Sequence, residues 1–325
     1  MNTNATTHSM TKIRKPNVSI SIGACAFILL SASSALAGNL SVGVGEENLP
    51  SPLISNRTSA GVPLPSGWGL KKSDIFGTGA SSTIQNYASL HNNYYEGLFY
   101  NRNAQGLVNI PNLVINNEQQ TYVHFEQAVK FSSDHVTIQA RGRADGSITS
   151  GEMVSTYAQR NFCIEARYKI PNVRYGWPAF WQYGADNGND DSEIDVEQPV
   201  TADQGINDVT MHNHTNEGAN IQIYSPYFTT QYMNYHNSAF DGSAISHTYT
   251  TCYNDNAKTI NRYIDGKRIY GAGYTWNESL GGTGHGPDAA TILNLAVGGN
   301  WPGNTPNPSS FSANFEIYSV LYYGP

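Results

Sequence analysis

Three carboxylates occupy alternate positions in one short segment of the chain. Glu193, Asp195 and Glu197 alternate there with Ile194 and Val196. Because successive side chains of a strand point to opposite faces, a strand would present the three acids on one face and the two aliphatic residues to a core. Neighbouring like charges raise one another's pKa, so a fold avoids this pattern unless a site uses it.

Paired carboxylates of this kind can hydrolyse a glycosidic bond with retention of configuration. One attacks the anomeric carbon and the other, kept protonated, donates to the leaving oxygen, with the two groups about 5–5.5 Å apart. Residues four apart on a straight strand are about 13 Å apart at Cα, so Glu193 and Glu197 must lean together over a concave sheet. Asp195 would share a proton network with both. The alternative interpretation is a solvated acidic strand face.

An aromatic segment shortly before the acids favours the hydrolytic interpretation. Trp177, Ala179 and Trp181 would share one strand face, and sugar rings stack on indoles. Either tryptophan could instead fill the core. Other chemistries find less support: His212 and His214 lack the helical H-E-x-x-H setting of a metalloprotease, and we find neither a phosphate-binding glycine loop nor a Gly-x-Ser-x-Gly elbow. We expect no metal at the site.

The pattern of the segments that must position these residues predicts strands. Apolar residues alternate with polar ones over 136–141 and 162–170, and further strands are expected over 291–297 and 315–323. Asp265-Gly266 lies between two strand-like runs, as in a two-residue hairpin. No amphipathic helix of three turns and no solenoid repeat is evident. The expected fold is all-β, with two antiparallel sheets packed face to face as a jelly-roll sandwich.

The N-terminal residues resemble an export signal. Basic residues precede an apolar run over 18–30, and Ala35-Leu36-Ala37 forms a small-residue cleavage site. We therefore expect residues 1–37 to be a signal peptide, with an uncleaved anchor as the alternative. Residues 38–66 are rich in Gly, Ser, Asn and Pro and predict a flexible leader. The catalytic domain is expected over 67–325.

Charge and cysteine usage narrow the possible partners. Without the signal, the chain keeps 15 basic and 25 acidic residues, which argues against nucleic acid. The 21 tyrosines suit strands and a surface that binds neutral rings. Cys25 leaves with the signal, so Cys163 and Cys252 remain in a compartment that permits disulfides. They form either a disulfide or two separate buried thiols, and the sequence does not decide between these.

From about Trp68 onward, an ordered series of segments resembles glycoside hydrolase family 16. This family of concanavalin-like jelly rolls includes laminarinases, lichenases, agarases and carrageenases. The segments are 116–122, 136–141, 164–171, 177–181, 193–197, 247–249, 263–267 and 293–303. The resemblance implies Glu193 as nucleophile, Glu197 as acid/base and Asp195 as the assisting acid, all in a concave substrate cleft.

The resemblance also implies residues that bind the substrate. His212 would face the same cleft from the neighbouring strand, and Trp301 would form an aromatic platform with Trp181 as a second. Trp177 and Asn117 complete the expected substrate-binding set. Glu316 falls where many members carry an aspartate associated with structural calcium, which argues against calcium here. We expect no cofactor, with a structural calcium ion as the alternative.

These features predict a secreted or periplasmic monomer that acts on polysaccharide and is not inserted stably in a membrane. The acid motif is lichenase-like in length, whereas Asn117-Glu118-x-Gln120-x-Tyr122 looks laminarinase-like. We expect an endo-β-1,3- or β-1,3-1,4-glucanase working through a covalent glycosyl-enzyme. The alternatives are hydrolysis or transglycosylation of a galactan or bacterial exopolysaccharide, and a non-catalytic carbohydrate-binding protein. The last would be expected to have lost an acid.

Overall fold

The computed structural model describes residues 56–97, 116–184, 193–202, 204–214, 231–273 and 289–325. The predicted signal peptide lies outside these ranges. None of the helices in these ranges is long and apolar enough to span a membrane. Of the two α-helices in these ranges, α1 (Tyr87–Asn93) has seven residues and α2 (Phe125–Ala128) has four, so neither reaches three turns.

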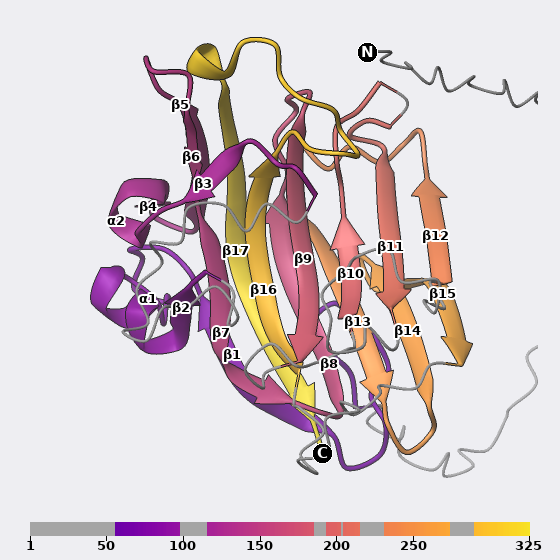
Figure 1. The fold of residues 1–325 in the computed structure, drawn as a ribbon. Helices are drawn as coiled ribbons and strands as arrows, with labels where there is room; N and C mark the ends of the chain where they lie inside the picture. The colour runs from indigo at the N-terminus through magenta and orange to yellow at the C-terminus, as the bar shows by residue number, and fades with distance from the viewer. Residues whose placement is uncertain (1–55, 98–115, 185–192, 203, 215–230, 274–288) are drawn as a thin grey trace, which may run out of the picture. The chain divides into compact units, whose positions relative to one another are not determined.

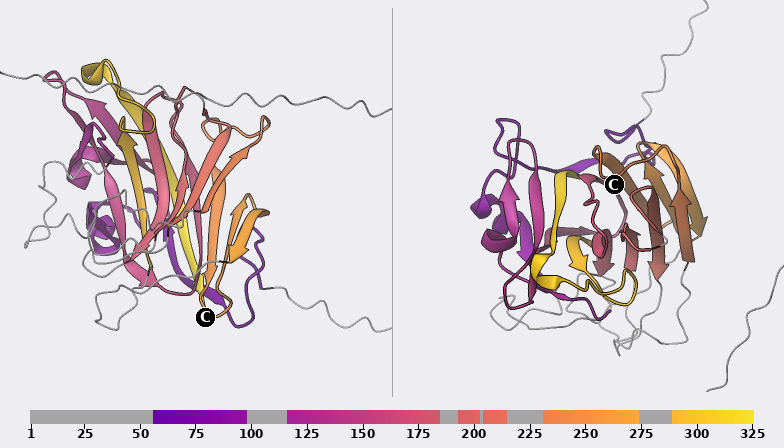
Figure 2. Two further views of the ribbon diagram at one scale, coloured as in Figure 1. Left: turned by 45° about the vertical axis from the view of Figure 1, so that its right-hand side comes forward. Right: turned by 90° about the horizontal axis from the view of Figure 1, so that it is seen from above.

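The strands form two sheets that face each other (Figure 1). One sheet has ten strands: β1 (Gly69–Ile75), β3 (Gln120–Tyr122), β4 (Val129–Phe131), β5 (Val136–Gly142), β6 (Ile148–Ser150), β8 (Phe162–Lys169), β13 (His247–Asn254), β14 (Thr259–Ile264), β15 (Lys267–Gly273) and β17 (Ser312–Gly324). Its strands run in the order β15-β14-β13-β8-β17-β5-β6-β3, with β1 also paired to β17 and β4 to β5. Seen from above, the strands lie in two layers (Figure 2). A short 3-10 helix, η2 (Pro308–Ser310), precedes β17.

The other sheet has seven strands and carries the acidic segment. They are β2 (Tyr94–Glu96), β7 (Glu152–Gln159), β9 (Gly176–Gly184), β10 (Glu193–Glu197), β11 (Asp208–His214), β12 (Gln231–His236) and β16 (Ala289–Val297). Their order is β12-β11-β10-β9-β16-β7-β2. Among the described strands, the pairings are antiparallel except that of β3 with β6. The predicted sandwich of two sheets is confirmed, with this one parallel pair in addition.

The predicted periodicity places the apolar residues between the sheets. Ile194 and Val196 of β10 are buried and belong to the same core cluster as Ile138 of β5 and Ile164 of β8. Burial of an aliphatic side chain of this size contributes roughly 1.5–3 kcal/mol to folding. This burial fixes the register of β10, because a slip by one residue would drive the acids into the core.

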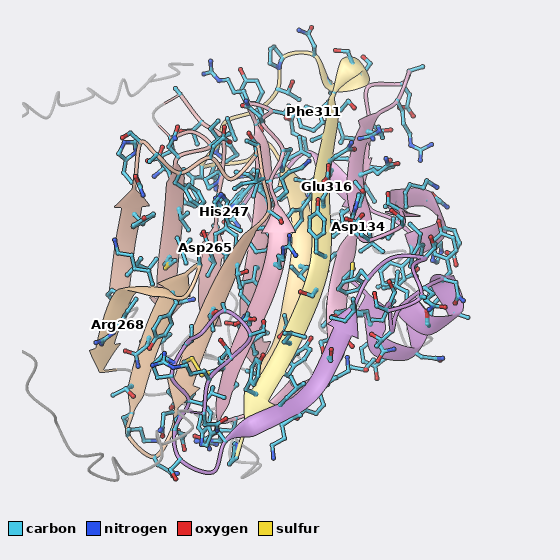
Figure 3. All side chains as sticks on the ribbon, turned by 180° about the vertical axis from the view of Figure 1, so that it is seen from behind. Asp134, His247, Asp265, Arg268, Phe311 and Glu316 are labelled. Carbon is cyan, nitrogen blue, oxygen red and sulfur yellow. A yellow bond between two sulfur atoms is a disulfide. The ribbon has the colours of Figure 1, made fainter. Side chains whose placement is uncertain are left out.

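The predicted hairpin joins β14 to β15. Asp265 and Gly266 have φ values of 47° and 75°, the left-handed region that a two-residue turn of this type needs at both positions. Asp265 also accepts hydrogen bonds from the backbone N–H of Thr248 and from the His247 ring. These contacts tie the turn to β13, and Figure 3 shows the two labelled side chains together.

The start of the folded part differs from the prediction. Residues 56–66 were expected in a flexible leader, yet Val62 is fully buried and packs with Trp68 and Tyr323 on the outer face of the ten-stranded sheet. Ser59 and the backbone N–H of Ala60 donate hydrogen bonds to Glu165 of β8. These partners lie about a hundred residues away in sequence, so the local Gly, Ser and Pro content could not reveal them.

Cys163 and Cys252 form a disulfide, which resolves the alternative left open by the sequence. They are directly opposite each other on β8 and β13, and both pack in the same cluster as Val62 and Trp68. The bond is visible on the outer side of the ten-stranded sheet in Figure 3. It links strands whose cysteines are 89 residues apart in the chain.

Candidate active site

The three predicted acids lie on a central strand of the seven-stranded sheet. Strand β10 is paired with β9 on one side and β11 on the other. Its Ile194 and Val196 point into the core, so Glu193, Asp195 and Glu197 lie on the outer face. The structure therefore confirms that the three carboxylates share one face.

Burial differs along this row. Asp195 is only 3% exposed, whereas Glu193 and Glu197 on either side are half-buried. The central acid is thus packed between its strand neighbours, while the outer two retain contact with solvent. This is the arrangement expected if the outer pair meets a ligand and the middle acid supports them.

Strand register brings the predicted aromatic residues beside the acids. Asp195 lies opposite Trp181 of β9, and Glu197 lies opposite Ala179. The Trp177 indole N–H donates a hydrogen bond of 2.9 Å to Oε1 of Glu197. Trp177 is 8% exposed, so its main contacts are with the protein, and it orients this carboxylate.

Trp301 reaches the site from the loop after β16. Its ring packs edge-on against Trp177, with the centroids 5.5 Å apart and an interplanar angle of 84°. The loop turns at Gly298, whose φ is 74° and where an added Cβ would lie 2.5 Å from Oε1 of Gln119. Glycine is therefore required there. Trp301 stays half-buried, which leaves part of it accessible.

Asn117 supports this loop through its side chain. Its amide donates a 2.8 Å hydrogen bond to Oδ1 of Asn300, and the backbone N–H of Asn300 donates to the carbonyl of Asn116. Asn117 itself has a φ of 58°. The structure thus places the predicted substrate-binding asparagine where it holds the residue next to Trp301.

A row of hydrogen bonds runs from Trp181 through Asn294 to Tyr122. The Trp181 indole N–H donates to Oδ1 of Asn294 on β16 at 2.9 Å, and the Asn294 amide donates to the hydroxyl of Tyr122 at 2.7 Å. Burial, and then the charges of Glu152 and Glu118, raise the pKa of Tyr122 well above its usual range. The hydroxyl is therefore neutral at physiological pH, and the row fixes the Trp181 ring.

Asn294 and Tyr122 were not among the predicted site residues. The available signal was Asn294 itself, a polar residue within the otherwise apolar run 292–297 of a fully buried strand. A buried amide in such a run needs hydrogen-bond partners. Those partners could not be found from local pattern, because Tyr122 is 172 residues away.

The remaining predicted residues are placed as follows. The backbone of His212 lies opposite Asp195 on β11, and its side chain is outside the described part of the chain. Glu316 lies on the ten-stranded sheet, away from the acids of β10 (Figure 3). It forms an ion pair with Lys169 and accepts a hydrogen bond from the Tyr318 hydroxyl, both at 2.9 Å. Residues 185–192, which lead into β10, are also outside the described part.

Comparison with known proteins finds a family model and a curated protein that match this chain. The family model described as the XgeA-like, catalytic GH16 domain matches residues 101–282. The clotting factor G alpha subunit of Tachypleus tridentatus is 28% identical over 172 residues, which cover 49% of this chain and 22% of that subunit. The matched region is thus under a quarter of that relative's length.

Solved structures share the fold at low sequence identity. The laminarinase catalytic domain of Thermotoga maritima is 21% identical, with a TM-score of 0.57, covering 79% of this chain and 98% of that one. The endo-1,3-β-glucanase of Streptomyces sioyaensis is 19% identical, with a TM-score of 0.59, covering 81% and 99%. A structure from work on endo-acting mucin O-glycanases of the human gut microbiota is 20% identical, with a TM-score of 0.57, covering 81% and 93%.

Proposed function

Because the chain belongs to glycoside hydrolase family 16, we propose that it is an endo-acting hydrolase that cleaves β-1,3- or β-1,3-1,4-glucan with retention of configuration. The observation that carries this proposal is the row on β10. It presents two half-buried glutamates on either side of a buried aspartate, with an indole donor on one glutamate. Such an asymmetric pair suits two different roles in one reaction.

In the proposed first step, Glu197 gives its proton to the glycosidic oxygen while a Glu193 oxygen attacks the anomeric carbon. The bond to the leaving sugar breaks and a covalent glycosyl-enzyme forms. In the second step, Glu197 takes a proton from water, and the oxygen of that water displaces Glu193. Asp195 lies between the two and supports both, which requires the glutamates to lean toward one another over the sheet.

The Trp177 hydrogen bond supports this division of roles. Oε1 of Glu197 already accepts the indole hydrogen, which favours placement of the transferable proton on Oε2. The carboxyl group is held in one orientation before substrate arrives. Fixed orientation of a proton donor is a recognised contribution to the rate of general acid catalysis.

The substrate class rests on relatives and on the lining of the site. Two of the similar structures are a laminarinase and an endo-1,3-β-glucanase, which favours a β-glucan. The similarity to a structure from the mucin O-glycanase work favours a second candidate, hydrolysis within a different polysaccharide or glycan. Trp181 and Trp301 suit stacking on sugar rings in either case.

A substrate panel separates these candidates. The protein is incubated with laminarin, mixed-linkage β-glucan, agarose, carrageenan and mucin O-glycans, and products are measured by chain length. We expect short oligosaccharides of several lengths from the β-glucans first, as endo action requires. Cleavage of only a galactan or mucin glycan would reject the glucan assignment, and binding without any product would reject the enzyme assignment.

We expect Trp301→Ala to weaken substrate binding about tenfold or more, because a stacked ring and its buried area are lost. Thermal stability should change little, since the ring stays half-buried in a loop. KM and oligosaccharide affinity by calorimetry measure the effect. Trp301→Phe keeps a ring and serves as the control. A large fall in Tm with unchanged affinity would assign the residue to packing alone.

We expect Trp177→Phe to lower kcat about 10- to 100-fold, because a hydrogen bond to a charged group contributes roughly 1.5–3 kcal/mol. The phenyl ring keeps most of the packing against Trp301. Since the lost N–H stabilises the ionised carboxylate, the alkaline limb of the kcat/KM profile should move to higher pH. A change confined to KM, with an unaltered pH profile, would contradict the orienting role.

We also propose that the protein is exported to the periplasm or the medium and acts there as a monomer. The signal-like residues 1–37 and the Cys163–Cys252 disulfide both support export. N-terminal sequencing of protein recovered from its native host should begin at Gly38. Recovery of the chain from the membrane fraction with residues 1–37 intact would reject cleavage.

A further inference from the structure

Two histidines and two glutamates meet at one side of the sandwich, away from the β10 acids. We name His91, Glu96, His124 and Glu126 the His–Glu cluster. They come from α1, from β2, and from the start of α2, elements that lie together beside β7 in Figure 1. The proposed hydrolysis uses none of these residues.

The ligand atoms of three of them lie close together. Nε2 of His91 is 3.0 Å from Oε1 of Glu126 and 4.0 Å from Oε1 of Glu96. One ligand atom from each of His91, Glu96 and Glu126 lies within 4.8 Å of the other two. Ligands about 2.0–2.2 Å from a shared zinc ion in a tetrahedron are about 3.4 Å apart, a spacing that these two distances bracket.

Other contacts hold the cluster in place. Oε1 of Glu96 accepts the backbone N–H of Phe125 at 2.6 Å, and its Oε2 is 2.7 Å from Nδ1 of His124. The His91 ring packs on Phe125, with the centroids 5.0 Å apart. The Glu96 side chain is only 10% exposed. Outer contacts of this kind orient metal-ligating carboxylates in known sites.

Charge favours a cation at this position. Glu96 and Glu126 bring two carboxylates to one place, each with an oxygen within reach of a shared ligand position. A divalent ion would neutralise them. Imidazole together with carboxylate is a ligand set that suits zinc and similar metals, whereas calcium and magnesium prefer oxygen ligands alone.

We propose that the His–Glu cluster binds one divalent transition-metal ion of the zinc type, ligated by His91, Glu96 and Glu126. His124 orients Glu96 from the outer shell, and water completes the coordination. The ion joins α1, β2 and α2, which are otherwise short elements at a sheet edge. Its role is structural, so the proposal does not depend on the assignment of the hydrolysed sugar.

The test uses the full mature chain without a histidine tag, treated with chelator and then freed of it. Zinc is titrated against a competing chromophoric chelator, and thermal unfolding is followed with and without zinc. We expect one bound zinc per chain and a rise in Tm. Glu126→Gln, an exposed and nearly isosteric change, should weaken binding at least tenfold and remove the rise. His91→Gln should do the same.

His236→Gln is the matched control, because His236 forms a similar exposed pair with Asp208 on β11. It should bind zinc as the unaltered protein does. Absence of binding at about 100 µM zinc by the unaltered protein would overturn the proposal. Zinc affinity in Glu126→Gln and His91→Gln equal to that of the unaltered protein would also overturn it, as would stabilisation by calcium in place of zinc. In a zinc-soaked crystal, an anomalous peak should lie among the three ligands.

Discussion

Glu193→Gln is expected to lower kcat at least about 10⁴-fold on polysaccharide. The amide is nearly isosteric with the carboxylate but cannot attack the anomeric carbon, and loss of a nucleophile removes most of an enzyme's rate enhancement. The fold should persist, because Glu193 is half-buried on the outer face and contributes nothing to the core between the sheets. Hydrolysis is followed by reducing-sugar release, and folding by the thermal transition.

Glu316→Gln provides the matched control for this variant. Glu316 pairs with Lys169 on the ten-stranded sheet, so the same change of side chain occurs far from β10 in the fold. Activity of the control should stay within about twofold, because Glu316 lies on the other sheet and a partly exposed ion pair contributes only about 0–1 kcal/mol to stability. Near-normal hydrolysis by Glu193→Gln, with an unchanged Tm, would remove Glu193 from the reaction.

Glu197→Ala is expected to show a different defect, one that depends on the leaving group. With no acid to protonate the glycosidic oxygen, turnover of polysaccharide should fall about 10²- to 10⁴-fold, the usual contribution of a general acid. An aryl glycoside with an activated leaving group needs little protonation, so it should still form the glycosyl-enzyme. A burst of released phenol followed by slow turnover would show this.

Azide provides the second half of this experiment. The glycosyl-enzyme of Glu197→Ala lacks the base that activates water, and azide can attack without one. Added azide should therefore speed turnover of the aryl glycoside and yield a glycosyl azide of retained configuration. Azide should give no such product with Glu193→Gln, which forms no covalent intermediate. Equal loss of activity on both substrates, without azide rescue, would contradict the acid/base role.

Much of the fold was predictable because it follows from local periodicity. The alternation over 162–170 gave β8, and the Asp265-Gly266 turn gave the hairpin between β14 and β15. Both signals depend only on neighbouring residues and on backbone geometry. The predicted start of the folded part, at residue 67, was too late. Local signals could not place it, because Val62 is buried by contacts with strands distant in the sequence.

The site was predictable as a set of residue types, and its contacts were not. Alternation placed Glu193, Asp195 and Glu197 on one face, which the burial of Ile194 and Val196 confirms. The hydrogen bond from Trp177 to Glu197 depends on the register of β9 against β10, which periodicity does not supply.

Contacts between residues far apart in the chain could not be predicted from local sequence patterns. Asn117 and Asn300 are 183 residues apart, yet their hydrogen bond holds the segment next to Trp301. The Cys163–Cys252 disulfide similarly depends on direct pairing of β8 with β13. The catalytic roles of the three acids stay predictions, and experiments on the protein must test them.

The most direct test of the account follows the anomeric configuration of the first products by proton NMR. The β-glucan that the protein cleaves best is digested in deuterated buffer, and spectra are recorded before mutarotation equilibrates the new reducing ends. Two displacements, first by Glu193 and then by water, predict that the β anomer appears first and the α anomer follows only at the rate of mutarotation. Initial release of the α anomer would show a single displacement and contradict the assignment of Glu193 as nucleophile.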